Sequence, residues 1–339
     1  MLLDRLGEVT AAAPPLRPAD WPTPTPAADE LLIRVAVCGV CHTELDEIEG
    51  RTPPPRLPVI LGHQVVGRVA ACGPSVEGFR KGDRVGVAWI FSTCGTCPAC
   101  QSGQENLCPH FRATGRDAPG GYAEFMTVSF RFAYALPEGL TDAEAAPLLC
   151  AGAIGYRSLR LTNLAEGQRL GLTGFGASAH LVLKLVRQRF PQTPVYVFSR
   201  TDRERQFALE LGAAWAGDVI AKSPEKLHAI IDTTPAWSPV VAALGNLAPG
   251  GRLVINAIRK EPADQAALLK LDYPRDLWLE KEIKSVANVT RRDVVEFLEL
   301  AATAPLRPEV QLYPLESANQ ALLDLKEKRI RGAKVLQVE

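Results

Sequence analysis

The sequence predicts an α/β protein of two parts, a β-rich N-terminal part followed by a doubly wound parallel sheet. Two observations predict this fold class. Up to Thr141, short β-branched runs alternate with segments rich in Gly, Pro and Asp, which is typical of a compact all-β unit with loops. From Gln168 onward, strand and helix patterns alternate, and such alternation indicates a parallel sheet covered by helices.

Length and composition narrow the classes of function. The 339 residues correspond to two domains at about 150 residues each. Lys plus Arg and Asp plus Glu both number 38, so the formal net charge is 0 and gives no electrostatic attraction to nucleic acid or an anionic membrane. No apolar run approaches the ~18 residues of a membrane span, and the N-terminus lacks a secretory signal. We therefore expect a cytoplasmic protein, whose 8 cysteines stay reduced and serve metal binding, catalysis or packing.

The first part is expected to consist mainly of strands and loops. Residues 11–26 are rich in proline and indicate extended chain. Strands are expected at Leu31–Val37, Val65–Ala70 and Arg84–Ile90, where β-branched residues recur.

The second part begins near Thr141, where Thr141–Glu144 fits a capping box that opens a helix. The expected strands are Leu170–Thr173, Val195–Phe198, Ala229–Asp232, Arg252–Ala257 and Lys284–Asn288. The expected helices are Ser178–Arg189, Asp202–Leu211 and Ser238–Leu247, and the tail adds helices at Arg291–Ala302 and Leu315–Lys328 and a strand at Ala333–Val338. These patterns predict domains at 1–150 and 151–283 and a C-terminal segment at 284–339.

Four cysteines form the most specific local motif. Cys94, Cys97, Cys100 and Cys108 lie within fifteen residues, and four thiolates can surround one Zn²⁺ as a closed structural site. An iron–sulfur cluster and four unrelated thiols are the alternatives. The spacing favours structural zinc.

A second set of metal-ligating side chains is dispersed along the chain. Cys41, His63 and Cys150 supply two thiolates and an imidazole, three protein ligands that leave a fourth position for water or substrate. Singly each is weak evidence, because a lone buried cysteine is usually a small hydrophobic residue. Sequence distance alone does not show that they converge.

A glycine-rich turn indicates a dinucleotide site. Gly174, Gly176 and Ala179 follow a strand and open a helix in the pattern G-x-G-x-x-A. The first glycine would make the tight turn, and the second would let a pyrophosphate approach the helix N-terminus. The surrounding strand–turn–helix order makes the motif strong.

The end of the next strand bears on which cofactor is used. An acidic residue here would bind the ribose 2′-hydroxyl of NAD, but the strand ends in Ser199 and Arg200, which suit the 2′-phosphate of NADP. Arg203 and Arg205 lie close behind. Alternatively, these arginines lie on a solvated helix and Asp202 is the ribose partner. We favour NADP over NAD.

These motifs together resemble the zinc-dependent alcohol dehydrogenases of the medium-chain dehydrogenase/reductase superfamily. The resemblance covers essentially the whole chain and is carried by the following segments: Gly39–Leu45, Leu61–Gly67, Gly82–Val85, the four-cysteine run, Leu148–Gly152 and Tyr313–Ala321. It implies a GroES-like catalytic domain, a Rossmann domain and a tail that returns to the catalytic domain. It also implies that Cys41, His63 and Cys150 hold a catalytic zinc, so that Zn²⁺ numbers two per chain.

The family pattern implies roles for residues around this zinc. Thr43 would hydrogen-bond the substrate oxygen and pass on its proton, the alternative being a turn-capping hydroxyl. His42 would face the cofactor pyrophosphate. Trp89 would line the substrate pocket, or equally pack as a core residue.

Three residues depart from the family pattern. Asp46 stands where many members have the histidine at the outer end of the proton relay, and we expect Asp46, or water, to take the proton. Glu44 replaces an aspartate and could still orient His63. Gln64 replaces a glutamate, which should leave zinc more electrophilic.

The resemblance implies hydride transfer between a primary or secondary alcohol, as the zinc-bound alkoxide, and NADP(H) or NAD(H). The expected activity is that of an alcohol dehydrogenase or aldehyde reductase on a small-molecule substrate. Alternatives are a polyol or aromatic (cinnamyl-type) alcohol dehydrogenase, or a catalytically silent binding protein that zinc merely stabilises. A homodimer or homotetramer is the implied assembly.

Overall fold

The computed structural model describes residues 1–303, 306–327 and 332–338. The chain forms two compact units, one made of Met1–Cys150 with Val289–Glu339 and the other of Ala151–Asn288. Among the described residues, no helix is both long enough and apolar enough to cross a membrane.

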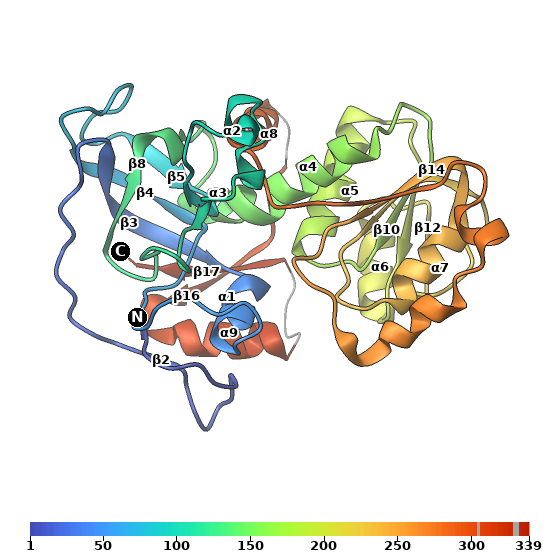
Figure 1. Ribbon diagram of the computed structural model, residues 1–339, viewed down its shortest axis with the longest axis horizontal. Coiled ribbons are helices and arrows are strands. Elements are labelled where there is room, and N and C mark those ends of the chain that lie inside the picture. Colours follow the sequence, from blue (N-terminus) through green and yellow to red (C-terminus); the bar gives the residue numbers. More distant parts are fainter. Residues whose placement is uncertain (304–305, 328–331, 339) are drawn as a thin grey trace. The chain divides into compact units, whose positions relative to one another are not determined.

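The first unit is built on a mainly antiparallel sheet (Figure 1). Its strands follow the order β16-β17-β3-β4-β5-β9, and β8 also pairs with β3. Their bounds are β3 Glu30–Val40, β4 Val65–Cys72, β5 Arg84–Val87, β8 Phe125–Ser129, β9 Ala133–Ala135, β16 Val310–Pro314 and β17 Ala333–Gln337. The apolar side chains of β3 are buried in alternation, so this strand runs through the core.

The C-terminal segment completes this sheet. Strand β17 pairs antiparallel with β3 and parallel with β16, so the last strand lies beside the first long one. Helices α8 (Arg291–Thr303) and α9 (Ala318–Lys326) belong to the same unit. The predicted end of the last helix, Lys328, lies outside the described residues.

Shorter elements carry the functional segments of this unit. They are α1 His42–Ile48, β6 Ile90–Ser92, α2 Pro98–Gln101, β7 Arg112–Ala113 and α3 Asp142–Pro147, with an N-terminal strand pair β1 Leu2–Leu3 and β2 Leu16–Arg17. The predicted strand Arg84–Ile90 is wrong in its extent: β5 ends at Val87, and β6 begins at Ile90 and pairs with β7 instead.

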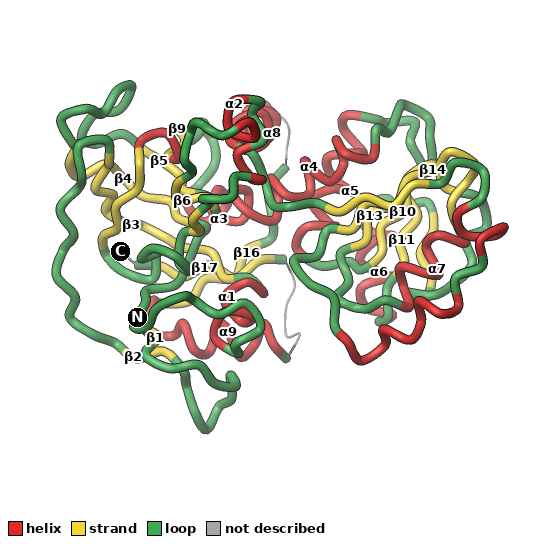
Figure 2. The backbone as a smooth tube through the Cα atoms, viewed as in Figure 1, coloured by secondary structure: helices red, strands yellow, loops and turns green. Residues whose placement is uncertain are grey.

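The second unit contains a sheet with helices beside it (Figure 2). The sheet has six strands, and each strand pairs parallel to its neighbours. The strand order is β12-β11-β10-β13-β14-β15, with bounds β10 Leu170–Thr173, β11 Val195–Phe198, β12 Trp215–Gly217, β13 Leu227–Asp232, β14 Leu247–Ile255 and β15 Glu282–Ser285. The helices are α4 Ala153–Thr162, α5 Ala177–Arg189, α6 Asp202–Glu210 and α7 Ser238–Asn246. The predicted α/β fold class, with a β-rich unit and a doubly wound parallel sheet, is confirmed.

Candidate active site and metal centres

Cys41, His63 and Cys150 converge within the first unit. Their ligand atoms all lie within 4.8 Å of one another. The Nε2 atom of His63 is 3.6 Å from the Cys41 sulfur and 3.4 Å from the Cys150 sulfur. Two thiol groups and one imidazole nitrogen therefore face a common point, as three ligands of a tetrahedral zinc site would.

Local structure fixes each of these three residues. Cys41 caps α1: its sulfur accepts from the Thr43 N–H at 3.4 Å, and its own N–H donates to the Glu44 carboxylate at 2.8 Å. His63 follows Gly62, whose φ of +99° suits glycine, and a Cβ at Gly62 would lie 2.5 Å from the Tyr122 ring. Cys150 lies in a π-helical turn, 148–152.

Glu44 holds the far side of the His63 ring. Its Oε1 lies 2.6 Å from His63 Nδ1, and both side chains are buried. Burial alone would lower the pKa of His63, but Glu44 and Cys41 raise it well above its usual value. This arrangement leaves Nε2 directed toward the two sulfurs and matches the carboxylate–histidine pairs that orient metal ligands.

The surroundings of Cys41 disfavour its free thiolate. The neighbouring Cys150 thiol, burial and the Glu44 carboxylate raise the pKa of Cys41 well above its usual value. A divalent cation would offset this penalty, because it stabilises the thiolates that ligate it.

The other residues predicted for this site differ in their exposure and contacts. His42 is exposed and Thr43 half-buried at the start of α1. Gln64 is buried next to His63. The half-buried Trp89 ring packs against Phe111, with centroids 4.8 Å apart.

Asp46 has a partner that the sequence did not suggest. Its carboxylate lies 2.5 Å from the Arg51 Nε, and its backbone carbonyl accepts from the N–H of Arg51 at 2.8 Å. The side chain is almost fully buried, so Arg51 holds the carboxylate in place.

Sequence reasoning missed Glu47. This residue is buried on α1, and neither carboxylate oxygen has a hydrogen-bond partner among the described residues. Burial and the Glu44 charge raise the pKa of Glu47 well above its usual value, while His63 and Arg116 act against the rise. The only signal in the sequence is its spacing, three residues after Glu44, which places both acids on one helix face.

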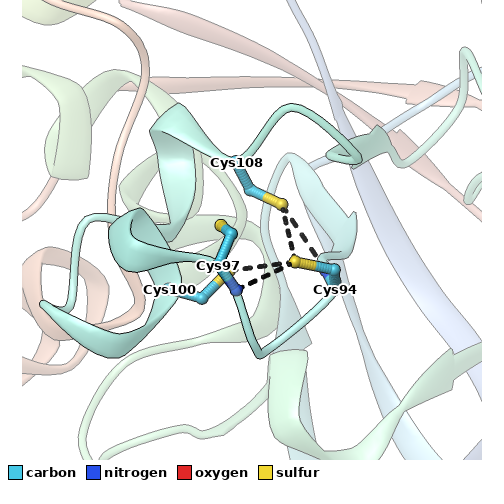
Figure 3. Close-up of side chains that lie close together, drawn as sticks. All are labelled: Cys94, Cys97, Cys100 and Cys108. Carbon is cyan, nitrogen blue, oxygen red and sulfur yellow. Dashed lines mark hydrogen bonds between the residues drawn. The ribbon is translucent and has the colours of Figure 1, made fainter.

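The four-cysteine run forms a second cluster in the first unit (Figure 3). The sulfur of Cys94 is 3.5 Å from that of Cys108 and 4.0 Å from that of Cys100, and all four sulfurs lie within 4.8 Å of one another. Backbone N–H groups of Thr96 and Cys97 donate to Cys94 and lower its pKa to about 5. All eight cysteines are described and none forms a disulfide. Four sulfur atoms this close together fit the ligand set of one tetrahedral ion.

The predicted dinucleotide motif lies at the carboxyl end of β10. Gly174 has φ +79°, and a Cβ there would meet the Thr233 hydroxyl at 2.6 Å, so only glycine fits. A Cβ at Gly176 would meet no described protein atom within 4 Å, which leaves room for a ligand at the start of α5. Ala179 is buried, as close packing of helix on strand requires.

Residues at the end of β11 form hydrogen bonds within the protein that the sequence did not suggest. Ser199 is buried and its hydroxyl donates to the Glu204 carboxylate, and its carbonyl accepts from Arg205 at 2.6 Å. Arg205 also pairs with Asp202. Arg200, two residues after the end of β11, is exposed.

Comparisons with known proteins agree with this geometry. Residues 27–138 match the alcohol dehydrogenase GroES-like domain. The probable alcohol dehydrogenase AdhA of Mycobacterium tuberculosis (strain CDC 1551 / Oshkosh) is 45% identical over 96% of this chain and 93% of its own length. The solved structure of an alcohol dehydrogenase from Aeropyrum pernix shares 26% identity over 99% of each chain, with a TM-score of 0.86. A cinnamyl alcohol dehydrogenase from Sorghum bicolor shares 28% identity over 99% of this chain and 96% of its own, with a TM-score of 0.85.

A relative of this identity, matched over nearly its full length, establishes the family. The chain therefore belongs to the zinc-dependent alcohol dehydrogenases of the medium-chain dehydrogenase/reductase superfamily and is an oxidoreductase.

Proposed function

We propose that this chain interconverts small primary or secondary alcohols and their carbonyl compounds, with zinc held by Cys41, His63 and Cys150 and with NADP(H) preferred. The single observation that carries the proposal is the convergence of these three ligand groups, whose ligand atoms all lie within 4.8 Å of one another. When bound there, zinc supplies Lewis acidity toward the substrate oxygen.

The chain's own residues would orient the reacting groups. Glu44 holds His63 so that its Nε2 faces the metal position. Thr43, two residues after Cys41, carries the hydroxyl that we assign to the substrate oxygen, since a hydroxyl donates and accepts at once. We assign His42 to the cofactor pyrophosphate and Trp89 to the substrate pocket.

A turnover screen tests the function. Primary, secondary and aromatic alcohols, and the matching carbonyl compounds, are offered with NADPH or NADP⁺ and with NADH or NAD⁺. Aromatic alcohols belong in the screen because of the likeness to a cinnamyl alcohol dehydrogenase. Metal analysis should find about two zinc ions per chain, the second held by the four-cysteine cluster. No turnover together with one zinc per chain would favour the silent binding protein.

Arg200 supports the cofactor preference. Its exposed guanidinium at the end of β11 could pair with a 2′-phosphate, whereas the nearby Glu204 carboxylate would act against one. We expect Arg200→Ala to lower kcat/KM for NADPH by about tenfold or more and to change that for NADH much less. Arg189→Ala, at the far end of α5, is the charge-matched control. A wild-type enzyme that clearly prefers NADH contradicts the proposal.

Asp46 is proposed as the outer member of the proton relay. We expect Asp46→Asn to shift the pH–rate profile and to lower turnover by up to about 10²-fold, because the amide cannot take the proton. Arg51→Gln removes the ion pair but keeps the carboxylate, so it separates proton transfer from the loss of the pair. Equal effects of the two variants, or an unchanged profile in Asp46→Asn, would remove Asp46 from the relay.

The edge of the parallel sheet supports a homodimer or a homotetramer. Strand β15 is the last strand of the sheet and all its residues are exposed. Ile283 on this strand and Trp278 and Leu279 just before it are about half exposed, and such an edge invites pairing with another chain. Sedimentation analysis should therefore report a dimer or tetramer that Ile283→Lys weakens. A monomer at all concentrations would be inconsistent with this assembly.

A further inference from the structure

Lys260 is a buried lysine at the carboxyl edge of the parallel sheet. Its ammonium contacts the Asp232 carboxylate and donates to the backbone carbonyls of Thr234 at 2.7 Å and Ala236 at 3.1 Å. The Lys260 side chain is 8% exposed and that of Asp232 0%. One side chain thus satisfies three acceptors, and a buried charge with this many partners is costly to disturb.

These contacts tie two loops together. The β13 loop (residues 233–237) joins β13 to α7, and the β14 loop (residues 256–261) follows β14 and contains Lys260. Just beyond their far ends, the carboxylate of Asp264, in the 3₁₀ helix Pro262–Lys270, accepts from the N–H of Ser238 at the start of α7 at 2.7 Å and from its hydroxyl at 2.8 Å. The two loops are therefore joined at both ends, and Lys260 provides the charged contact nearest the sheet.

The β13 loop lies directly against the glycine turn. Thr233 donates its N–H and its hydroxyl to the carbonyl of Thr173, at 2.8 Å and 3.0 Å. A Cβ at Gly174 would lie 2.6 Å from the Thr233 hydroxyl and 3.2 Å from the Thr234 methyl group. The position of the β13 loop therefore determines how much room is left beside the glycine turn. This turn lies at the carboxyl edge of the sheet, where open parallel sheets bind ligands.

We propose that Lys260 is a positioning residue for the nicotinamide dinucleotide: by tying the β13 loop to the β14 loop, it keeps the edge beside Gly174 in the shape that binds the cofactor. This inference rests on the proposed dinucleotide function. Without the ammonium, Asp232 loses its ion pair and the β13 loop loses two hydrogen bonds. The loop then spends a smaller fraction of time in the conformation that binds the cofactor, and apparent affinity falls in proportion to that fraction.

The test compares two lysines of the same unit in the purified, zinc-loaded full chain. Lys281 also donates to two carbonyls, those of Leu244 at 3.1 Å and Arg275 at 2.6 Å, but it precedes β15 and so lies at the opposite, amino edge. Titration of cofactor fluorescence gives Kd for NADPH and NADH, and thermal unfolding gives Tm. We expect Lys260→Met to raise the Kd for the preferred cofactor by about tenfold. Lys281→Met should lower Tm but keep Kd within about twofold of wild type.

Further variants keep the inference falsifiable. A double variant, Asp232→Asn with Lys260→Met, removes both members of the buried charge pair. It replaces the single variant in the test if Lys260→Met alone fails to fold, and it should show the same loss of affinity. Lys260→Arg should restore most of the binding. An unchanged Kd in the folded Lys260 variants, or an equal loss in Lys281→Met, overturns the inference while leaving the dinucleotide function standing. A wild-type chain that binds neither cofactor overturns that function and this inference together.

Discussion

Replacement of Cys150 by Ala is expected to lower turnover by about 10³-fold or more, because the Lewis acidity of the metal contributes several kcal/mol to catalysis. Bound zinc should fall from about two ions per chain to about one. Cys150 is the best of the three ligands to replace. Cys41 also caps α1, and loss of His63 would leave Glu44 buried without its partner. A defect in Cys150→Ala therefore reports on the metal site rather than on the helix or the buried pair.

Cys38→Ala is the matched control. Cys38 is a fully buried cysteine of the same unit, on β3, and lies outside both cysteine clusters. It should keep both zinc ions and most of its turnover, with only the modest loss of stability that a small core truncation causes. Two zinc ions and near-wild-type turnover in Cys150→Ala would contradict the assignment of the site.

The local motifs of this chain could be predicted because neighbours in sequence form them. The four-cysteine cluster lies within fifteen residues. The G-x-G-x-x-A pattern between a strand and a helix is typical of one kind of turn, that of dinucleotide-binding domains. The dispersed cluster could not be derived in this way: 87 residues separate His63 from Cys150, and only the folded sheet brings them together. The family resemblance suggested this cluster, and the geometry agrees with it.

Side-chain partners were the least predictable feature. Ser199 was expected to be available to a cofactor, yet its hydroxyl bonds Glu204 on the following helix. Asp46 pairs with Arg51, which neither residue type nor spacing indicated. Glu47 is buried, and its only signal in the sequence was its spacing from Glu44. Strand β12 was missed for a related reason, since three half-buried residues carry no clear alternation.

Replacement of Cys100 by Ser is expected to destabilise the chain more than any other change considered so far. The segment around the four cysteines has little core of its own: α2 has no buried residue, and the Leu107 side chain is 51% exposed. Structural zinc sites contribute about 10–16 kcal/mol of apparent binding free energy in small zinc domains, so loss of a ligand removes most of what orders this segment. We expect Tm to fall by about 10 °C or more.

Cys100→Ser also distinguishes the structural metal site from the catalytic one. Cys100→Ser should retain the catalytic zinc and, at low temperature, substantial turnover, whereas Cys150→Ala should retain Tm and lose turnover. Cys72→Ala, an exposed cysteine outside both clusters, is the control and should leave Tm and metal content unchanged. Iron with visible absorbance in the wild-type chain would identify an iron–sulfur cluster instead. Two zinc ions retained in Cys100→Ser would mean that Cys100 is not a required ligand. An unaltered Tm after loss of one zinc ion would mean that packing, and not the metal, holds this segment, which its exposed side chains argue against.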